Sequence, residues 1–156
     1  VIHVPNPQQA LSEMHRVLKP GGRVAVSVWE AANPTNGFGL LYGAITTKAD
    51  MEVELPHGPD FFQFSVPEKL VNALLEIGFS EPAVHNVSQT WEFQDRNGLM
   101  TSFMEGAVRA RGLIAAQTPA VQQSISNIVV EGMNNYVSSD GAYHIPMPAL
   151  IGSAIK

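Results

Sequence analysis

Cysteine is absent from this chain of 156 residues. Its absence excludes disulfide bonds, thiolate metal sites and cysteine nucleophiles. A chain without cysteine fits a reducing compartment, and we expect a cytoplasmic protein. The five histidines form no i, i+4 pair and have no carboxylate at metal-ligand spacing, so we predict no metal site from His3, His15, His57, His85 and His144.

Basic residues are scarce, with 9 Lys and Arg against 14 Asp and Glu and a net charge of -5. Nucleic-acid binding needs a basic face, and the few cations are scattered singly, so we expect no nucleic-acid partner. No apolar run approaches the roughly 18 residues of a membrane span, and no signal peptide opens the chain. A small molecule, neutral or cationic, is the partner that this composition favours.

The first third of the chain has the pattern of an α/β unit. Asn6 is suited to cap a helix that carries an apolar stripe as far as Leu18, and Gly21 and Gly22 are suited to the tight reversal that follows. The next segment, 23–29 (RVAVSVW), alternates valine with small residues. This pattern predicts a strand covered on both sides.

Further patterns predict alternating helices and strands along the rest of the chain. Ser65 and Glu68 form a capping box at the start of one helix, and Gly78 is suited to end it in a left-handed conformation. The predicted helices cover 38–49, 65–77, 99–111 and a long segment from 118, and the predicted strands cover 83–93 and 149–155.

Three segments in order resemble the class I S-adenosylmethionine (SAM)-dependent methyltransferases. Val4-Pro5-Asn6-Pro7, Ala10-Leu11 and the run 16–23 (RVLKPGGR) are similar to the stretch between the fourth and fifth strands of that family. The strand ending in 26–29 (VSVW) is similar to the branch of ubiquinone and menaquinone methyltransferases. The segments 68–79 and 144–155 resemble the helix before the sixth strand and the final strand.

The resemblance implies an α/β fold, the C-terminal half of a Rossmann-like methyltransferase sheet. Its strands five, seven and six would be 23–29, 149–155 and 83–93, with helices on both faces and a helical lid insert. We therefore expect residues 1–156 to form a single partial domain. The family holds SAM with a glycine-rich turn and an acidic residue, and this chain contains no such turn. SAM is then the cofactor of the intact enzyme, and we expect this chain to bind none.

The resemblance also suggests which residues border the ligands. His3 and Val4 would follow the fourth strand and border the cofactor pocket, or form a frayed terminus. Trp29 would end the fifth strand at the edge where α/β sheets place ligands, or pack as a core aromatic. Aromatic residues after this strand would cover a flat apolar substrate or simply anchor loops: Phe38, Tyr42, Phe61, Phe62 and Phe64. No residue is identified as a catalytic base.

The predicted function is that of a piece of a SAM-dependent methyltransferase acting on a small molecule, inactive alone. The alternative is a non-catalytic oligomeric interaction or ligand-binding domain that retains only the scaffold. In either case the fourth strand is missing, which leaves 23–29 as an exposed apolar edge. We therefore expect a homo-oligomer formed through this strand.

Overall fold

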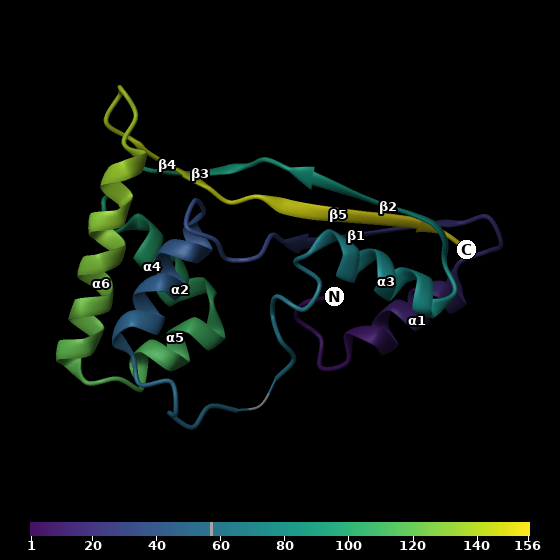
Figure 1. Cartoon of the computed structure of the whole chain (residues 1–156), viewed down its shortest axis with the longest axis horizontal. Helices are drawn as coiled ribbons and strands as arrows, with labels where there is room; N and C mark the ends of the chain where they lie inside the picture. The colour runs from purple at the N-terminus through teal and green to yellow at the C-terminus, as the bar shows by residue number, and fades with distance from the viewer. Residues whose placement is uncertain (57) are drawn as a thin grey trace. The chain divides into compact units, whose positions relative to one another are not determined.

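A computed structural model describes residues 1–56 and 58–156 (Figure 1). The described chain divides into two compact units. The sheet unit comprises residues 1–31, 58–89 and 148–156, and the helical unit comprises residues 32–56 and 90–147. The predicted α/β class is confirmed, because the chain combines helices with β-sheets.

The sheet unit contains three strands in the order β1-β5-β2. Strand β5 (Ala149–Ile155) lies in the middle and is antiparallel to both β1 (Arg23–Trp29) and β2 (Ser80–Val87). The two outer strands are therefore parallel to each other. This arrangement confirms the predicted spatial order of the segments at 23–29, 149–155 and 83 onward.

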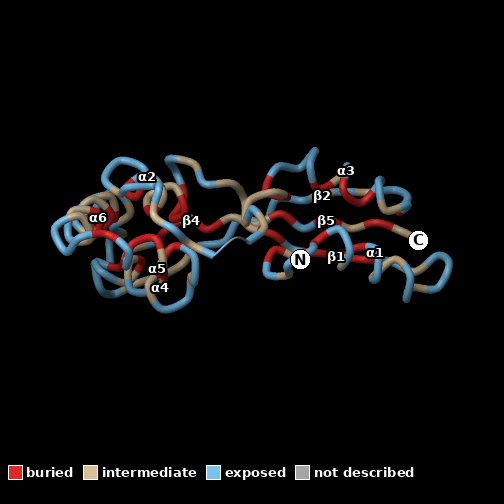
Figure 2. The backbone as a smooth tube through the Cα atoms, turned by 90° about the horizontal axis from the view of Figure 1, so that it is seen from below, coloured by how far each residue is buried: buried red, intermediate tan, exposed pale blue. Residues whose placement is uncertain are grey.

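One face of this sheet carries the core of the unit. Val24, Val26 and Val28 are buried, whereas the alternate residues of β1 are exposed or half-buried. Helices α1 (Pro7–Val17) and α3 (Pro67–Ile77) both pack on the valine face (Figures 1 and 2). The prediction that helices cover both faces of the sheet is therefore not met in this unit, where both described helices lie on one face. A connection between parallel strands is right-handed, so α3 has only one face available, and α1 lies beside it.

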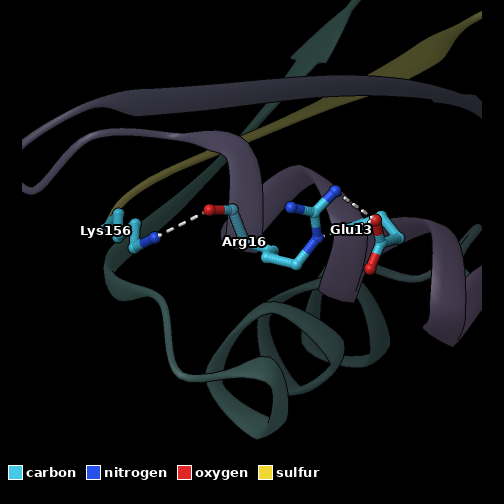
Figure 3. A network of polar contacts seen from close by, with 3 residues as sticks. All are labelled: Glu13, Arg16 and Lys156. Atoms are coloured by element: carbon cyan, nitrogen blue, oxygen red, sulfur yellow. Dashed lines mark hydrogen bonds and ion pairs between the residues drawn. The ribbon is translucent and has the colours of Figure 1, made fainter.

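Local signals set the two ends of α1 as the sequence predicts. The Asn6 side chain accepts a hydrogen bond of 2.9 Å from the backbone N–H of Gln9, and Gly21 has a φ of 77°. The last residue of the chain, Lys156, donates from its Nζ to the carbonyls of Arg16 and Leu18 at 3.2 and 2.8 Å (Figure 3). A cation at this position satisfies carbonyls that the helix leaves unpaired.

The start of α3 differs from its prediction, and its end agrees. The N-cap is Val66, without a side-chain hydrogen bond, so the predicted capping box of Ser65 and Glu68 is wrong. The backbone N–H of Ser65 donates to the carbonyl of Phe62 in the preceding turn, and its carbonyl accepts from the N–H of Ala31. Its side chain is buried. Gly78, with a φ of 101°, ends the helix as predicted.

The predicted strand over 83–93 is two strands in two different sheets. Strand β2 ends at Val87, and β3 (Thr90–Phe93) pairs with β4 (Tyr143–Pro146) in the helical unit. Strand β4 was not predicted, because prolines are unsuited to strand interiors. Pro146 occupies its last position, where a missing N–H is tolerated.

The helical unit confirms a helix-rich insert, assembled from two separate segments of the chain. Phe38, Leu41 and Ile45 of α2 are buried, as are Ile125 and Val129 of α6. The predicted helix over 99–111 is interrupted at 107, which leaves Val108 89% exposed instead of buried. The helices of this unit are α2 (Gly37–Lys48), α4 (Gly98–Gly106), α5 (Val108–Ala115), α6 (Pro119–Met133) and the short η1 (Asn134–Tyr136).

Gln117 joins two segments of the helical unit that are distant in sequence. Its side chain is 8% exposed. The Oε1 atom accepts from the backbone N–H of Asp50 at 2.9 Å, and Nε2 donates to the carbonyls of Asp50 and Leu113 at 2.9 and 3.1 Å. All polar atoms of this buried amide are therefore satisfied. In the part of the chain that the structure describes, no helix combines the length and apolarity needed to cross a bilayer.

Candidate functional site at the end of the sheet

A hollow of about 490 Å³ lies in the sheet unit where β1 ends. Its volume falls within the range of small-molecule sites. Three parts of the chain contribute: the N-terminal residues, the carboxyl end of β1, and the neighbouring ends of β5 and β2. The lining residues are Val1, Ile2, His3, Ser27, Val28, Trp29, Val87, Gln89, Ala149 and Ile151.

The floor of the hollow belongs to the sheet face that no helix of this unit covers. Trp29 lies opposite Ala149, and Val87 lies opposite Ala149 on its other side, so these three form one row across the sheet. Ser27 and Ile151 form part of the next row. Directly paired residues of antiparallel strands point to the same face. The register therefore builds an apolar surface next to the hydroxyl of Ser27.

Two of the predicted site residues meet at this hollow. His3 and Trp29 both line it, although 25 residues separate them in the sequence. Trp29 is half-buried and also packs against the valine core, and its contact with a ligand stays a prediction. Val4 is not among the described residues that line the hollow.

The predicted lid aromatics belong to two different units. The ring of Phe61 lies 5.7 Å from that of His3 and 5.0 Å from that of Phe62, which places this pair near the hollow. Phe64 is 4% exposed and belongs to the core of the sheet unit. Phe38 and Tyr42 lie on α2 in the helical unit, and Phe38 packs against another ring in its core.

Sequence patterns did not identify most of the lining. Ser27, Val87, Ala149 and Ile151 reach the hollow through strand pairing, and Gln89 through the loop after β2. The one sequence signal for this lining is the alternation along β1, which predicts that Ser27 and Trp29 lie on the same face of the strand. The neighbours across the sheet required the register, which a single sequence does not contain.

The chemistry of the lining is apolar with a few polar groups. His3, Ser27 and Gln89 supply hydrogen-bonding side chains, and none of the described lining residues is Asp, Glu or Gly. The described residues hold no cluster of His, Asp and Glu suited to a metal ion, and His57 lies outside them. The carboxyls with clearly lowered pKa lie elsewhere. The hydrogen bond from Arg16 lowers the pKa of Glu13, and that from Ser138 lowers the pKa of Asp140.

Two solved structures illustrate what the chain is similar to. A provisionally named methyltransferase of Bacillus halodurans matches with a TM-score of 0.49 and 19% identity, over 99% of this chain and 64% of the other. Phosphoethanolamine N-methyltransferase 2 of Haemonchus contortus, in complex with S-adenosyl-L-methionine, matches with a TM-score of 0.42 and 15% identity. There the match covers 99% of this chain and 31% of the other. No curated protein matches.

A match to a protein-family model locates the similarity in one segment of the chain. The model described as a methyltransferase domain matches residues 1–26. This segment contains α1, the reversal at Gly21 and the first half of β1. It also contains the three N-terminal residues of the hollow. The opening 26 residues of this chain are thus similar to a methyltransferase domain, in the same segment where its sequence resembles the class I SAM-dependent enzymes.

Proposed function

We propose that this chain is the acceptor-side part of a SAM-dependent methyltransferase that acts on a small molecule. One observation carries the proposal: the segment that matches the methyltransferase domain begins with residues that line a hollow together with Trp29. Ligands of open α/β sheets bind beyond the carboxyl ends of strands, and β1 ends at this hollow.

The reaction of such an enzyme makes few demands on acid–base residues. When bound in the intact enzyme, SAM would supply an electrophilic methyl group for transfer to an oxygen, nitrogen or carbon of the acceptor. Most of the rate enhancement comes from aligning the two molecules and excluding water. An apolar floor with a few polar groups at its rim suits this task. We propose a flat, largely apolar acceptor held against Trp29.

The residues of the hollow do not by themselves fit SAM. Binding its ribose hydroxyls calls for a carboxylate, and close approach of its charged end to the backbone calls for glycine. Neither residue type is found in the described lining. We propose that His3 borders the cofactor and that other residues of the enzyme hold it. This chain alone then binds SAM weakly and transfers no methyl group.

Two tryptophans allow a direct test of acceptor binding. The chain contains two tryptophans, Trp29 at the hollow and Trp91 in the helical unit. In a chain labelled with ¹⁵N-tryptophan, we expect millimolar catechol, a flat hydroxylated ring, to shift the indole N–H signal of Trp29. The signal of Trp91 serves as the internal control. A shift of Trp91 alone, or of neither indole, contradicts binding at the hollow.

A second measurement addresses the cofactor separately. Calorimetry of the full chain with SAM should show a dissociation constant weaker than about 1 mM, that is, less than roughly 4 kcal/mol of binding free energy. Micromolar binding contradicts the proposal that the cofactor grip lies elsewhere. Catechol binding lost in Trp29→Leu but kept in Trp91→Phe places the acceptor at the hollow, whatever the outcome with SAM.

The lack of a carboxylate in the described lining also favours the second candidate, a non-catalytic oligomeric interaction or ligand-binding domain. The two candidates differ in the DNA upstream of the Val1 codon. An open reading frame with a strand and a glycine-rich turn, about one half-domain earlier, supports the methyltransferase. A start codon just upstream supports the binding domain.

A further inference from the structure

The chain contains two Asn-Gly pairs, and the structure places them in opposite environments. Asn36-Gly37 stands at the start of α2, and Asn97-Gly98 stands at the start of α4. Asn36 is 1% exposed, whereas Asn97 is an exposed residue. Glycine has no Cβ to shield its backbone nitrogen, so this nitrogen can approach Cγ of the asparagine before it. The two pairs can therefore be compared for one reaction, the loss of the side-chain amide.

The side chain of Asn36 is fixed as the cap of α2. Its Oδ1 accepts from the backbone N–H of Gly39 at 2.9 Å and from that of Asn33 at 3.3 Å. The following glycine is enclosed, since a Cβ at Gly37 would lie 2.5 Å from Sδ of Met147. Turning the amide onto the nitrogen of Gly37 would break the cap, and burial excludes the water that completes the reaction. The first pair is therefore protected in the folded chain.

The side chain of Asn97 has no such task. It accepts no hydrogen bond from the first turn of α4, all of which lies in the described part of the chain. Its Nδ2 instead donates to the exposed carboxylate of Asp95 at 3.1 Å. The N–H of Gly98 donates to the carbonyl of Asp95 at 2.9 Å, in a turn that precedes Leu99, the first buried residue of the helix. This turn can open while Leu99 stays packed, and opening frees the nitrogen of Gly98.

Packing requires the glycine at position 98. A Cβ there would lie 2.5 and 2.7 Å from Cδ1 and Cγ of Phe93, and 2.8 Å from its Cβ. Phe93 ends β3, and its ring meets that of Trp91 edge-on with 6.3 Å between the ring centres. The Phe93 side chain therefore has little room to give way. The contact between β3 and α4 thus fixes the residue type that makes Asn97 reactive.

We propose that Asn97 deamidates spontaneously in the folded chain and that Asn36 does not. The proposal is independent of methyl transfer. The backbone nitrogen of Gly98 loses its proton and attacks Cγ of Asn97, and ammonia leaves as a five-membered succinimide ring closes. Water then opens the ring at either carbonyl, which gives aspartate or isoaspartate. The net reaction consumes one water molecule and releases one molecule of ammonia.

The two products differ in their effect on α4. Aspartate adds a negative charge at the N-terminus of the helix, where the helix dipole favours it. Isoaspartate carries the main chain through the former side chain, which adds a methylene group to the backbone. It thereby displaces the carbonyl of residue 97, which accepts from the N–H of Thr101 at 2.9 Å. The isoaspartate form is thus an aged protein with a loosened first turn of α4.

Ageing the full chain in mildly alkaline buffer tests the proposal. The chain is then digested with pepsin at low pH, where succinimide formation is slow, and the peptides are analysed by mass spectrometry. We expect amide loss at Asn97 to be at least about tenfold faster than at Asn36, because the first needs only a turn to open. In concentrated urea the two rates should agree within a factor of about three, since an unfolded chain protects neither pair.

Asn97→Gln is the matched control, because glutamine must close a six-membered ring and reacts far more slowly. Equal rates at the two pairs in the folded chain overturn the proposal, as does faster loss at Asn36. A folded chain that loses the amide of Asn97 no faster than Asn97→Gln loses that of its glutamine also overturns it.

Discussion

Gly152 lies where α3 packs most closely on the sheet, and adding one methyl group there tests the packing. A Cβ at this position would lie 2.7 Å from Cδ2 and 2.9 Å from Cγ of Leu70. Leu70 is fully buried within the core, and Gly152 is flanked on its two sides by Val26 and Val84. The methyl group of an alanine therefore cannot enter unless Leu70 or the helix shifts.

Two opposing terms set the size of the effect. Overpacking a close-packed core costs about 1–3 kcal/mol. Replacing a strand glycine by alanine returns roughly 0.5–1 kcal/mol, because the unfolded chain loses conformational freedom. We therefore expect Gly152→Ala to lower the free energy of unfolding by about 1–2 kcal/mol. Because Leu70 is enclosed on all sides, the packing term outweighs the entropic gain.

Urea denaturation followed by tryptophan fluorescence measures this change. In a Trp91→Phe background the emission comes from Trp29, which lies in the same unit as Gly152. Ser153→Ala is the control, because it changes the next residue of β5 on the other face. Its effect should stay within about 0.5 kcal/mol. A Gly152→Ala variant as stable as the parent would refute the packing account.

A double-mutant cycle with Leu70→Ala adds a second criterion. Leu70→Ala alone should cost about 2–5 kcal/mol because it leaves a cavity. If the two side chains compete for one space, the double variant is less destabilised than the sum of the singles by roughly 0.5–3 kcal/mol. Additive effects would show that the methyl group is accommodated without Leu70.

Two further predictions concern the helical unit. Gln117→Leu should lower the free energy of unfolding of this unit by about 1–3 kcal/mol, because the N–H and carbonyl of Asp50 lose their buried partner. Urea denaturation followed through the fluorescence of Trp91 measures this change. A variant as stable as the parent would contradict the prediction. The Ser138 hydroxyl and the backbone N–H of Ala142 hold the pKa of Asp140 below its usual 3.8. The carboxylate of Asp140 therefore contributes stability above about pH 4, and this contribution is lost as the pH falls through the lowered pKa. An NMR titration that gives a pKa of Asp140 at or above the usual value would contradict this prediction.

Most of the elements were predictable because their signals are local. The Asn6 cap, the reversal at Gly21 and the end of α3 at Gly78 depend on side chains and φ angles within a few residues. Strand 23–29 showed its two faces by alternation. Of the residues proposed for a site, His3 and Trp29 line one hollow, and the aromatics of the insert belong to two units; their contact with ligands stays a prediction.

The failures share a cause in interactions between distant segments. Nothing near Val87 indicates that the chain leaves one sheet there and enters another at Thr90. The polarity of Ser65 suggested a cap, yet its carbonyl pairs with the N–H of the distant Ala31 and its side chain is buried. Val108 fitted an apolar stripe until the interruption at 107 exposed it.

The sequence by itself determined the α/β class, both ends of α1, the C-terminal end of α3, and the resemblance of the opening segment to a methyltransferase. These follow from periodicity, capping and glycine conformations, which act over one or two turns of chain. Tertiary structure alone decided the sheet register, the single covered face and the lining of the hollow. Strand pairing joins residues more than one hundred positions apart, and the free energy of such contacts depends on the whole fold.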